Sequence, residues 1–314
     1  MKIDLSVAVQ LWLFEEYPYG VINCADLFDQ FCVFFFSQKY GNAIVKVRKG
    51  ANIDNTFSKV LDDLATFDKI KPMRNHSTGY SYFVKKNHNN TPQELLNIIY
   101  PYGYLSHLSA MQYYDLTDKL PITIFMTFLA NNEWKMVSVK DHLEKVTPFF
   151  PEDEEVFCHI PRYPVQDTYF KKELFFKRVK KLEPHTEFEN KLKVINVGEL
   201  FIQMLNEPDL CGGFDHVFDI YQQYAKIFLK KILKSLDMAS KIDQTRVCFM
   251  LDKVLDIKNQ KIDRIKETMK NQRGSSRKMI SNESFSPYFC LEWNISLNHY
   301  LLEPYGTTNR NMGE

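Results

Sequence analysis

The sequence has little glycine, 11 residues of 314, so a glycine-rich phosphate-binding loop is not expected. It also lacks a Cys-x-x-Cys pair, because its six cysteines are scattered, and this favours reduced thiols over a zinc site. Neither sign of charge is in excess, since 40 Lys and Arg face 39 Asp and Glu. A uniformly basic nucleic-acid coat is therefore excluded, whereas a local basic surface is not.

Long apolar runs are missing too. The most apolar short run covers 32–36, whereas a membrane span needs about 20 residues. The N-terminus shows no charged-then-apolar leader. The hydrophobic content of 45% and the charged content of 25% are those of a globular protein. We therefore expect a cytoplasmic protein with no membrane partner, no metal and no cofactor.

The first third of the chain shows the spacing of three helices. Apolar residues recur at helical intervals over 6–16, and Asn23 is a plausible N-cap for a second helix over 24–36. A third helix begins near Asn55. Its inward stripe consists of Phe57, Val60, Leu61 and Leu64.

A hairpin is predicted after the third helix, with strands over 69–74 and 80–86. Helix, helix, helix, hairpin is the order of elements in a winged helix-turn-helix. We therefore predict an α+β protein with two domains. Residues 1–90 form a winged-helix-like DNA-binding domain, and residues 91–314 form a larger mixed α/β domain.

Later segments are predicted from the same kinds of pattern. One long helix is expected over 214–236, and a final strand over 289–298. Lysines mark the outward face of that helix, and a second basic cluster lies within 171–181. For both basic stretches one interpretation is a solvated helix face, and the other is an electrostatic surface for an acidic protein or RNA.

The third helix is the candidate DNA reader. With its apolar stripe inward it projects Asn55 and Lys59, whose side chains can bond base edges, although Asp62 on the same side has the wrong sign for a polyanion. Residues 33–90 carry ten basic and four acidic side chains, a net charge of +6 that favours nucleic acid. The alternative is a winged helix used for dimerisation or protein contact. The remaining candidate contacts, to the DNA backbone or minor groove, are Thr56, Lys69, Arg74, His76 and Lys85.

Enzyme chemistry finds little support in the sequence. Ser106 and His107 are neighbours, but no pattern connects them to a distant acid and no Gly-x-Ser-x-Gly motif is present. Cys211 precedes two glycines at the start of a helix, where a buried thiol is the ordinary interpretation. We expect no catalytic residues, with an uncharacterised hydrolase or nuclease using His107 or Cys211 as a weaker alternative.

Four segments of the second half resemble, in this order, the AbiEi family, the antitoxins of type IV toxin–antitoxin systems that act in phage defence by abortive infection. The likeness covers roughly residues 100–300. The segments are Tyr104–Pro121, Leu205–Phe214, Thr245–Asp252, and Ser276–Met279 followed by Trp293–Asn294.

The resemblance implies a bifunctional regulator. Its N-terminal domain would bind operator DNA, the inverted repeats upstream of its own operon, and act as a transcriptional autorepressor. Its C-terminal domain would counteract a nucleotidyltransferase-like toxin, a task that in type IV systems does not require a stable complex with the toxin. The alternative is a protein-interaction module that neutralises a toxin without binding DNA.

Overall fold

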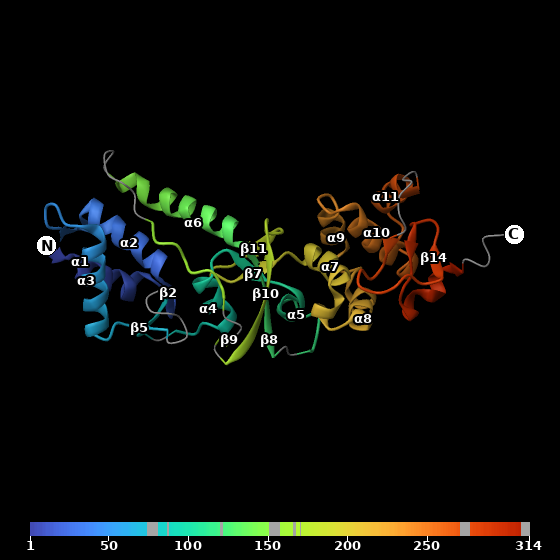
Figure 1. The fold of residues 1–314 in the computed structure, drawn as a ribbon, viewed down its shortest axis with the longest axis horizontal. Coiled ribbons are helices and arrows are strands. Elements are labelled where there is room, and N and C mark those ends of the chain that lie inside the picture. The colour runs from blue at the N-terminus through green and yellow to red at the C-terminus, as the bar shows by residue number, and fades with distance from the viewer. Residues whose placement is uncertain are drawn as a thin grey trace. The chain divides into compact units, whose positions relative to one another are not determined.

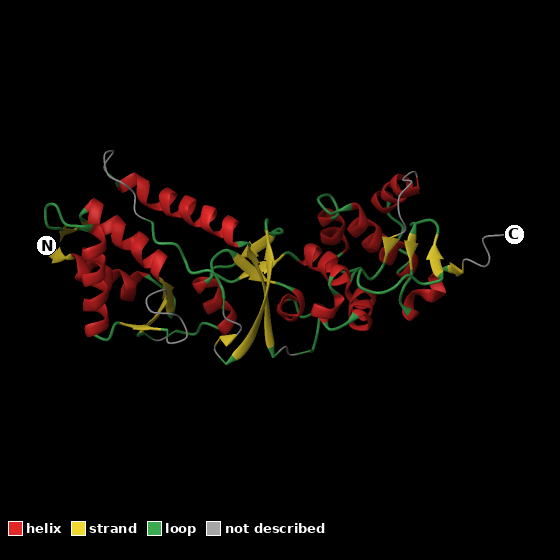
Figure 2. Ribbon diagram, in the orientation of Figure 1, coloured by secondary structure: helices red, strands yellow, loops and turns green. Residues whose placement is uncertain are grey.

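The fold was analysed in a computed structural model of the chain. It describes residues 1–308 except 74–80, 87, 120–121, 151–157, 166–167, 170 and 271–276. The predicted α+β fold class is confirmed, because helices and strands occur in both compact units of the chain (Figures 1 and 2). The first unit comprises residues 1–104, 127–182 and 187–193, and the second comprises 105–126, 183–186 and 194–314.

The three helices predicted in the first third of the chain are present. They are α1 (Leu5–Leu11) with its π-helical continuation η1 (Trp12–Glu16), α2 (Cys24–Ser37) and α3 (Ile53–Thr66). Asn23 caps α2 as predicted, since its side chain accepts a hydrogen bond from the Asp26 N–H at 2.8 Å. Asn52 caps α3 in the same way, through the Asn55 N–H at 2.9 Å. The third helix therefore begins at Ile53 rather than near Asn55.

Two small sheets accompany these helices. Their strands are β1 (Lys2–Asp4), β2 (Val21–Asn23), β3 (Lys39–Tyr40), β4 (Ala43–Lys46), β5 (Ile70–Pro72) and β6 (Ser81–Val84). The orders are β1-β4-β3 and β2-β6-β5, and the second sheet is antiparallel, with Phe83 opposite both Val21 and Lys71. Three helices are thus followed by a hairpin that pairs with the strand between α1 and α2. The segment between α2 and α3 is long because it holds β3 and β4.

An aromatic core holds this part of the first unit together. The rings of Phe28 and Phe57 meet edge to face at 5.0 Å, and Phe28 stacks on Phe31 at 5.9 Å. Val60 and Leu64 are buried in the same core, as the helical stripe of α3 predicted, whereas Leu61 is half-buried.

A helix from the middle of the chain packs onto α2, and the first unit therefore extends beyond the domain expected from the sequence. His142 of α6 (Asn131–Val146) lies with its Nδ1 2.5 Å from Asp29 Oδ1 of α2, and both residues are buried. Its ring also stacks near Phe28, with centroids 6.0 Å apart. Residues 127–182 therefore belong to the first unit, and the division differs from the boundary expected at residue 90.

The six-stranded sheet has the order β11-β12-β7-β8-β10-β9. Its strands are β7 (Gly103–Leu105), β8 (Thr123–Leu129), β9 (Thr168–Tyr169), β10 (Lys172–Val179), β11 (His185–Glu187) and β12 (Lys193–Ile195). The shorter helices of this part of the chain are α4 (Pro92–Ile99), α5 (His107–Tyr113) and η2 (Thr147–Phe149), and η2 follows α6 and contacts α2. In the basic cluster of residues 171–181, Lys172, Lys177 and Arg178 lie on β10 and the other three lysines flank this strand, so the helix face expected there is wrong. Lys172 and Arg178 lie on the same face of the strand as Leu174 and Phe176, and Lys177 lies on the other face, because successive strand residues point to opposite faces.

The second unit is mainly helical. Its helices are α7 (Val197–Asn206), η3 (Pro208–Cys211), α8 (Phe214–Tyr224), α9 (Leu229–Ser235), α10 (Lys241–Phe249), η4 (Met250–Val254), α11 (Gln260–Lys270) and η5 (Tyr300–Tyr305). A four-stranded sheet follows in the order β13-β15-β14-β16. Its strands are β13 (Arg277–Lys278), β14 (Tyr288–Cys290), β15 (Ile295–Ser296) and β16 (Thr307–Thr308).

Two predicted elements of the second unit are divided in the structure. The helix expected over 214–236 is interrupted between α8 and α9, where the N–H groups of Ile227 and Phe228 both bond to the Tyr224 carbonyl. These turns preserve the apolar spacing, so the pattern could not reveal the break. The strand expected over 289–298 is a hairpin, because Asn294 adopts φ +49° in a turn, a conformation that asparagine tolerates.

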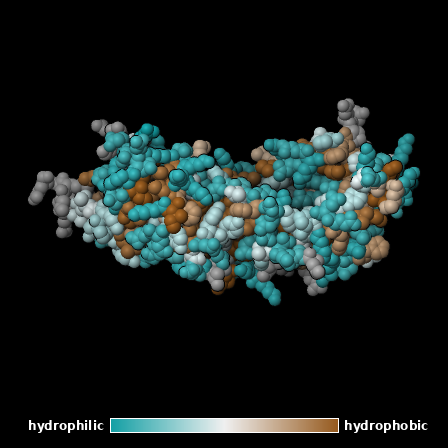
Figure 3. All heavy atoms as spheres, turned by 180° about the vertical axis from the view of Figure 1, so that it is seen from behind, coloured by the Kyte–Doolittle hydropathy of each residue, from teal (hydrophilic) through white to brown (hydrophobic). Residues whose placement is uncertain are grey.

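Hydrophilic residues cover most of the face drawn in Figure 3, with smaller hydrophobic patches among them. Within the described ranges, every helix is too short or too polar to span a bilayer.

Candidate nucleic-acid interface

The hairpin of β5 and β6 presents a group of cations. Strand alternation buries Ile70 and turns Lys71 outward. A shallow depression of about 500 Å³ forms beside the hairpin, and its lining is basic and aromatic. The residues that line it are Lys71, Phe83, Val84, Lys85, Lys86 and His88. Three lysines around one depression create a positive potential of the kind that attracts phosphate groups.

The lysines of this depression differ in how they are paired. Lys85 Nζ lies 3.3 Å from Asp68 Oδ1, but both side chains are exposed, so the pair is weak. Lys86 Nζ donates to the Leu13 carbonyl at 3.0 Å, and burial lowers the pKa of Lys86. Lys71 is exposed and forms no ion pair with any residue that the structure describes. Lys71 and Lys85 are therefore the cations best placed to contact an anion.

The candidate readers on α3 are accessible. Asn55 and Lys59 are both exposed, so neither is packed beneath the rest of the first unit. Thr56 is half-buried, and its hydroxyl donates to the Asn52 carbonyl at 2.6 Å. That hydroxyl is used in the first turn of the helix, so Thr56 is a poorer phosphate contact than the sequence suggested.

The outward face of α3 is also acidic. Asp54, Asp62 and Asp63 are all exposed on the helix, against the single lysine Lys59. Asp54 Oδ1 lies 3.6 Å from His159 Nε2, which is its nearest cationic group when the histidine is protonated. The positive charge of this region is therefore concentrated on the hairpin rather than on the helix.

The other predicted contacts lie at or next to the hairpin. Lys69 is half-buried with its Nζ over the ring of Phe14, 5.2 Å from the centroid, which limits its reach. Arg74 and His76 lie outside the described residues. The structure thus places Lys85 in the depression and Asn55 and Lys59 on α3.

Sequence reasoning did not single out Lys71, Lys86 and His88 as site residues, although the first two were part of the basic count. The signal that could have identified Lys71 is its place in the strand, since it alternates with the buried Ile70. His88 could not be found in this way, because it follows the hairpin and no periodicity applies there.

The segments that carry the family resemblance are bonded to one another in the second unit. Arg246 donates to Asn206 Oδ1 at 2.8 Å and to the Lys278 carbonyl at 3.0 Å. Trp293 Nε1 donates to Asp252 Oδ2 at 3.0 Å. All four segments are linked through buried or part-buried polar contacts, since His107 of the first segment bonds to Glu207 of the second. Arg246 and Asp252 therefore have structural partners.

Ser106 and His107 form a buried hydrogen-bonded chain with an acid. His107 Nδ1 lies 2.8 Å from Ser106 Oγ, and its Nε2 lies 2.9 Å from Glu207 Oε2. Both Ser106 and His107 are fully buried, so the serine hydroxyl faces no substrate space. Cys211 is buried as well, and burial raises its pKa, which keeps the thiol protonated. Ser106, His107 and Cys211 therefore lack the solvent exposure that nucleophilic catalysis needs.

Among the described residues, no group of three or more His, Cys, Asp or Glu side chains is arranged to hold a metal ion.

No protein-family model matches the chain. No curated protein matches it either. Among solved structures it is similar to the RV2827C protein from Mycobacterium tuberculosis, with 11% identity and a TM-score of 0.43 over 93% of this chain and 90% of that chain. A likeness this distant identifies neither a family nor a function.

Proposed function

We propose that the chain is a DNA-binding autorepressor and the antitoxin of a type IV toxin–antitoxin operon. The observation that supports the DNA-binding half is the lysine-lined depression on a hairpin that follows three helices, the element order of a winged helix. The antitoxin half rests on the family resemblance, whose segments are joined through Arg246 and Asp252 in the second unit.

In this proposal the hairpin supplies affinity and α3 supplies sequence preference. Lys71 and Lys85 contact phosphates, which fixes the protein on the duplex without reading its sequence. Asn55 and Lys59 then meet base edges in the major groove. Because Asp62 and Asp63 flank these readers, α3 is repelled by the polyanion and the hairpin lysines have to offset that repulsion.

Removing two hairpin lysines is expected to weaken DNA binding evenly across sequences. For Lys71→Gln with Lys85→Gln, the slope of log affinity against log salt should become shallower by about 2. Each phosphate contact contributes roughly 0.9 to this slope, and the double variant loses two contacts. Affinity should fall by roughly tenfold or more at low salt. The measurement is a mobility-shift titration on the chain's own promoter at several salt concentrations.

The matched control is Lys135→Gln with Lys140→Gln, two exposed lysines of α6 in the same unit. It removes the same charge from another face and should leave the salt slope close to wild type. Equal slopes for wild type and the hairpin variant would refute hairpin binding. In cells that carry the cognate toxin, the hairpin variant should lose repression but still rescue growth. Deleting residues 1–90 is a poorer test, because it would uncover the face of α6 that packs on α2.

The acidity of α3 favours a second candidate function, contact with a basic protein surface instead of DNA. Asp62→Asn with Asp63→Asn separates the two. If α3 faces DNA, removing two negative charges should strengthen binding to the promoter several-fold at low salt and steepen its salt dependence. If α3 binds a protein, DNA affinity should not change and the growth rescue should weaken.

A further inference from the structure

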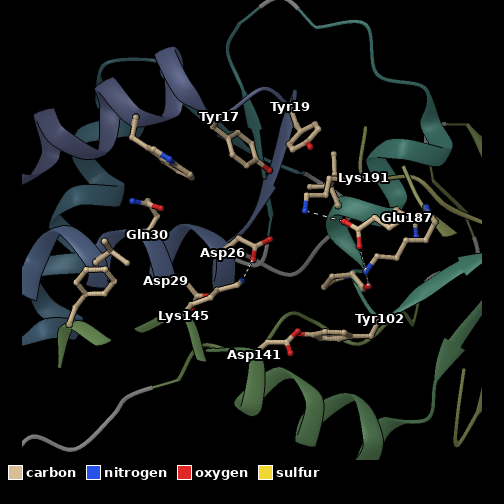
Figure 4. A pocket seen from close by; sticks show the side chains of 17 residues that line it. Tyr17, Tyr19, Asp26, Asp29, Gln30, Tyr102, Asp141, Lys145, Glu187 and Lys191 are labelled. Carbon is tan, nitrogen blue, oxygen red and sulfur yellow. Dashed lines mark hydrogen bonds and ion pairs between the residues drawn. The ribbon is translucent and has the colours of Figure 1, made fainter. Parts of the chain in front are cut away.

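A cavity of about 640 Å³ lies in the first unit (Figure 4). Its lining shares no residue with that of the hairpin depression. Its walls come from η1, α2, α4, α6 and the segment 187–193, all of which belong to this unit. The volume is that of a site for a small organic molecule. The lining combines aromatic rings with charged groups of both signs.

One wall is a series of three aromatic rings. Trp12 and Tyr17 lie 5.2 Å apart between ring centroids, and Tyr17 and Tyr19 meet edge to face at 5.3 Å. The π-helical turn brings the first two together, because the Tyr17 N–H bonds to the Trp12 carbonyl at 2.9 Å. Such turns occur frequently at functional sites.

The hydroxyl groups of this wall are already used. Tyr17 donates to the Val21 carbonyl at 2.8 Å, and Tyr19 donates to the Glu189 carbonyl at 3.0 Å. What these side chains offer to the cavity is therefore ring surface. Lys86 Nζ lies 5.7 Å from the centroid of Tyr17, so one ring of the wall already has a cation near it.

The lysines of the cavity are all paired with its carboxylates. Lys145 Nζ lies 2.9 Å from both Asp26 and Asp29. Glu187 accepts from Lys191 at 3.1 Å and lies 3.5 Å from Lys193 (Figure 4). An anionic ligand would have to separate these pairs before it could use a lysine, which makes the cavity a poor anion site.

One carboxylate of the cavity has no cationic partner. Asp141 is half-buried and forms no ion pair with the residues that the structure describes. Its neighbour is the hydroxyl of Tyr102, and burial together with this carboxylate raises the pKa of Tyr102, so the phenol stays a neutral donor. The lining thus holds one negative charge more than its lysines balance.

We propose that this cavity binds a small organic cation, a guanidinium or alkylammonium group with an apolar stem. Asp141 would accept hydrogen bonds from the cationic head, and the rings of Trp12 and Tyr19 would cover its stem and charge. The half-buried amide of Gln30, which also lines the cavity, would supply one further acceptor. This site does not depend on the proposed DNA binding.

The test is isothermal titration of the full chain with agmatine, spermidine and N-acetylarginine amide. We expect saturable binding of one cation per chain and a raised thermal midpoint. Tightest binding of agmatine or spermidine would indicate a free metabolite, and tightest binding of the arginine amide would indicate a peptide side chain. Sodium citrate at equal ionic strength should not bind.

Asp141→Asn should weaken binding of the best probe by about tenfold or more, while the asparagine still accepts from Tyr102. The matched control is Glu144→Gln, an exposed carboxylate on the same helix that faces Lys140 instead of the cavity. It should bind like wild type. No saturable binding of any cation, citrate binding as tight as cation binding, or equal affinity in wild type and Asp141→Asn would each overturn the proposal. Thermal unfolding of both variants shows that they are folded, so a loss of affinity can be assigned to the site.

Discussion

Replacing Gly198 by alanine is expected to destabilise the second unit, although alanine is the better helix former. A Cβ at position 198 in α7 would lie 2.4 Å from the backbone oxygen of Lys231 and 2.4 Å from Ser235 Oγ. Because the Lys231 atom belongs to the backbone of α9, the two helices would have to move apart. Overpacking of this kind destabilises a protein by about 3 kcal/mol, whereas the higher helix propensity of alanine relative to glycine stabilises it by about 1 kcal/mol. We expect a net loss of about 2 kcal/mol, measured by urea unfolding followed by circular dichroism.

The comparison for this substitution is Gly41→Ala, in the turn between β3 and β4. A Cβ there would meet nothing within 4 Å, and only the backbone angle of φ +52° is unfavourable. Its expected cost is about 1 kcal/mol, from conformation alone. A Gly198→Ala variant as stable as wild type would contradict the close approach of α7 and α9.

The local elements of the first third could be predicted because their signals are local. The cap at Asn23 and the stripe of Phe57, Val60 and Leu64 depend on residues within a few positions, and both are confirmed. The packing of α6 on α2 could not be predicted, because the contact between Asp29 and His142 joins distant parts of the chain. The predicted boundary at residue 90 missed residues 127–182 for this reason.

The candidate sites, too, depend on contacts between distant parts of the chain that the sequence does not reveal. The basic excess of residues 33–90 was visible in the sequence, but its separation into a cationic hairpin and an acidic α3 depends on which side chains are exposed. The cavity was not foreseen, because its aromatic wall comes from η1 and the residues after it, whereas Asp141 comes from α6. The isolated sequence around Asp141 gives no sign that this residue lines the same cavity as Trp12.

Removing the Asp252 carboxylate is expected to have a large effect on stability, because the indole of Trp293 and the ammonium group of Lys266 both bond to it. Asp252 is 5% exposed, accepts from Trp293 Nε1 at 3.0 Å and lies 2.5 Å from Lys266 Nζ. Asp252→Ala would leave a buried indole N–H without its acceptor and Lys266 with only Glu292, at 3.4 Å. Breaking a buried pair in this way costs about 3 kcal/mol, which urea unfolding can measure.

The control is Asp256→Asn, because asparagine tolerates the left-handed backbone of φ +48° that Asp256 adopts. Asp256 also lies 2.5 Å from a lysine, Lys258, but the two side chains are 82% and 74% exposed. The distance between carboxylate and lysine is the same in the two pairs, but Asp252 is buried and also accepts from Trp293. Exposed pairs contribute little, so this variant should unfold at the same urea concentration as wild type. Similar losses in both variants would show that burial does not set the strength of these pairs.

The contribution of Asp252 to the free energy of unfolding should also depend on pH, and the shift of its pKa on folding determines the direction. Burial acts to raise that pKa, but the bonds from Lys266 and Trp293 outweigh it, so the pKa of folded Asp252 lies below the usual value. A lowered folded pKa means that the stabilisation is complete above the unfolded value of about 3.9 and is lost as pH falls through the folded one. The gap in unfolding free energy between wild type and Asp252→Ala should therefore be constant from about pH 8 to pH 5 and narrow below about pH 4. A gap that stays constant into the acid range would show that packing, and not the ionised carboxylate, joins α11 to Trp293.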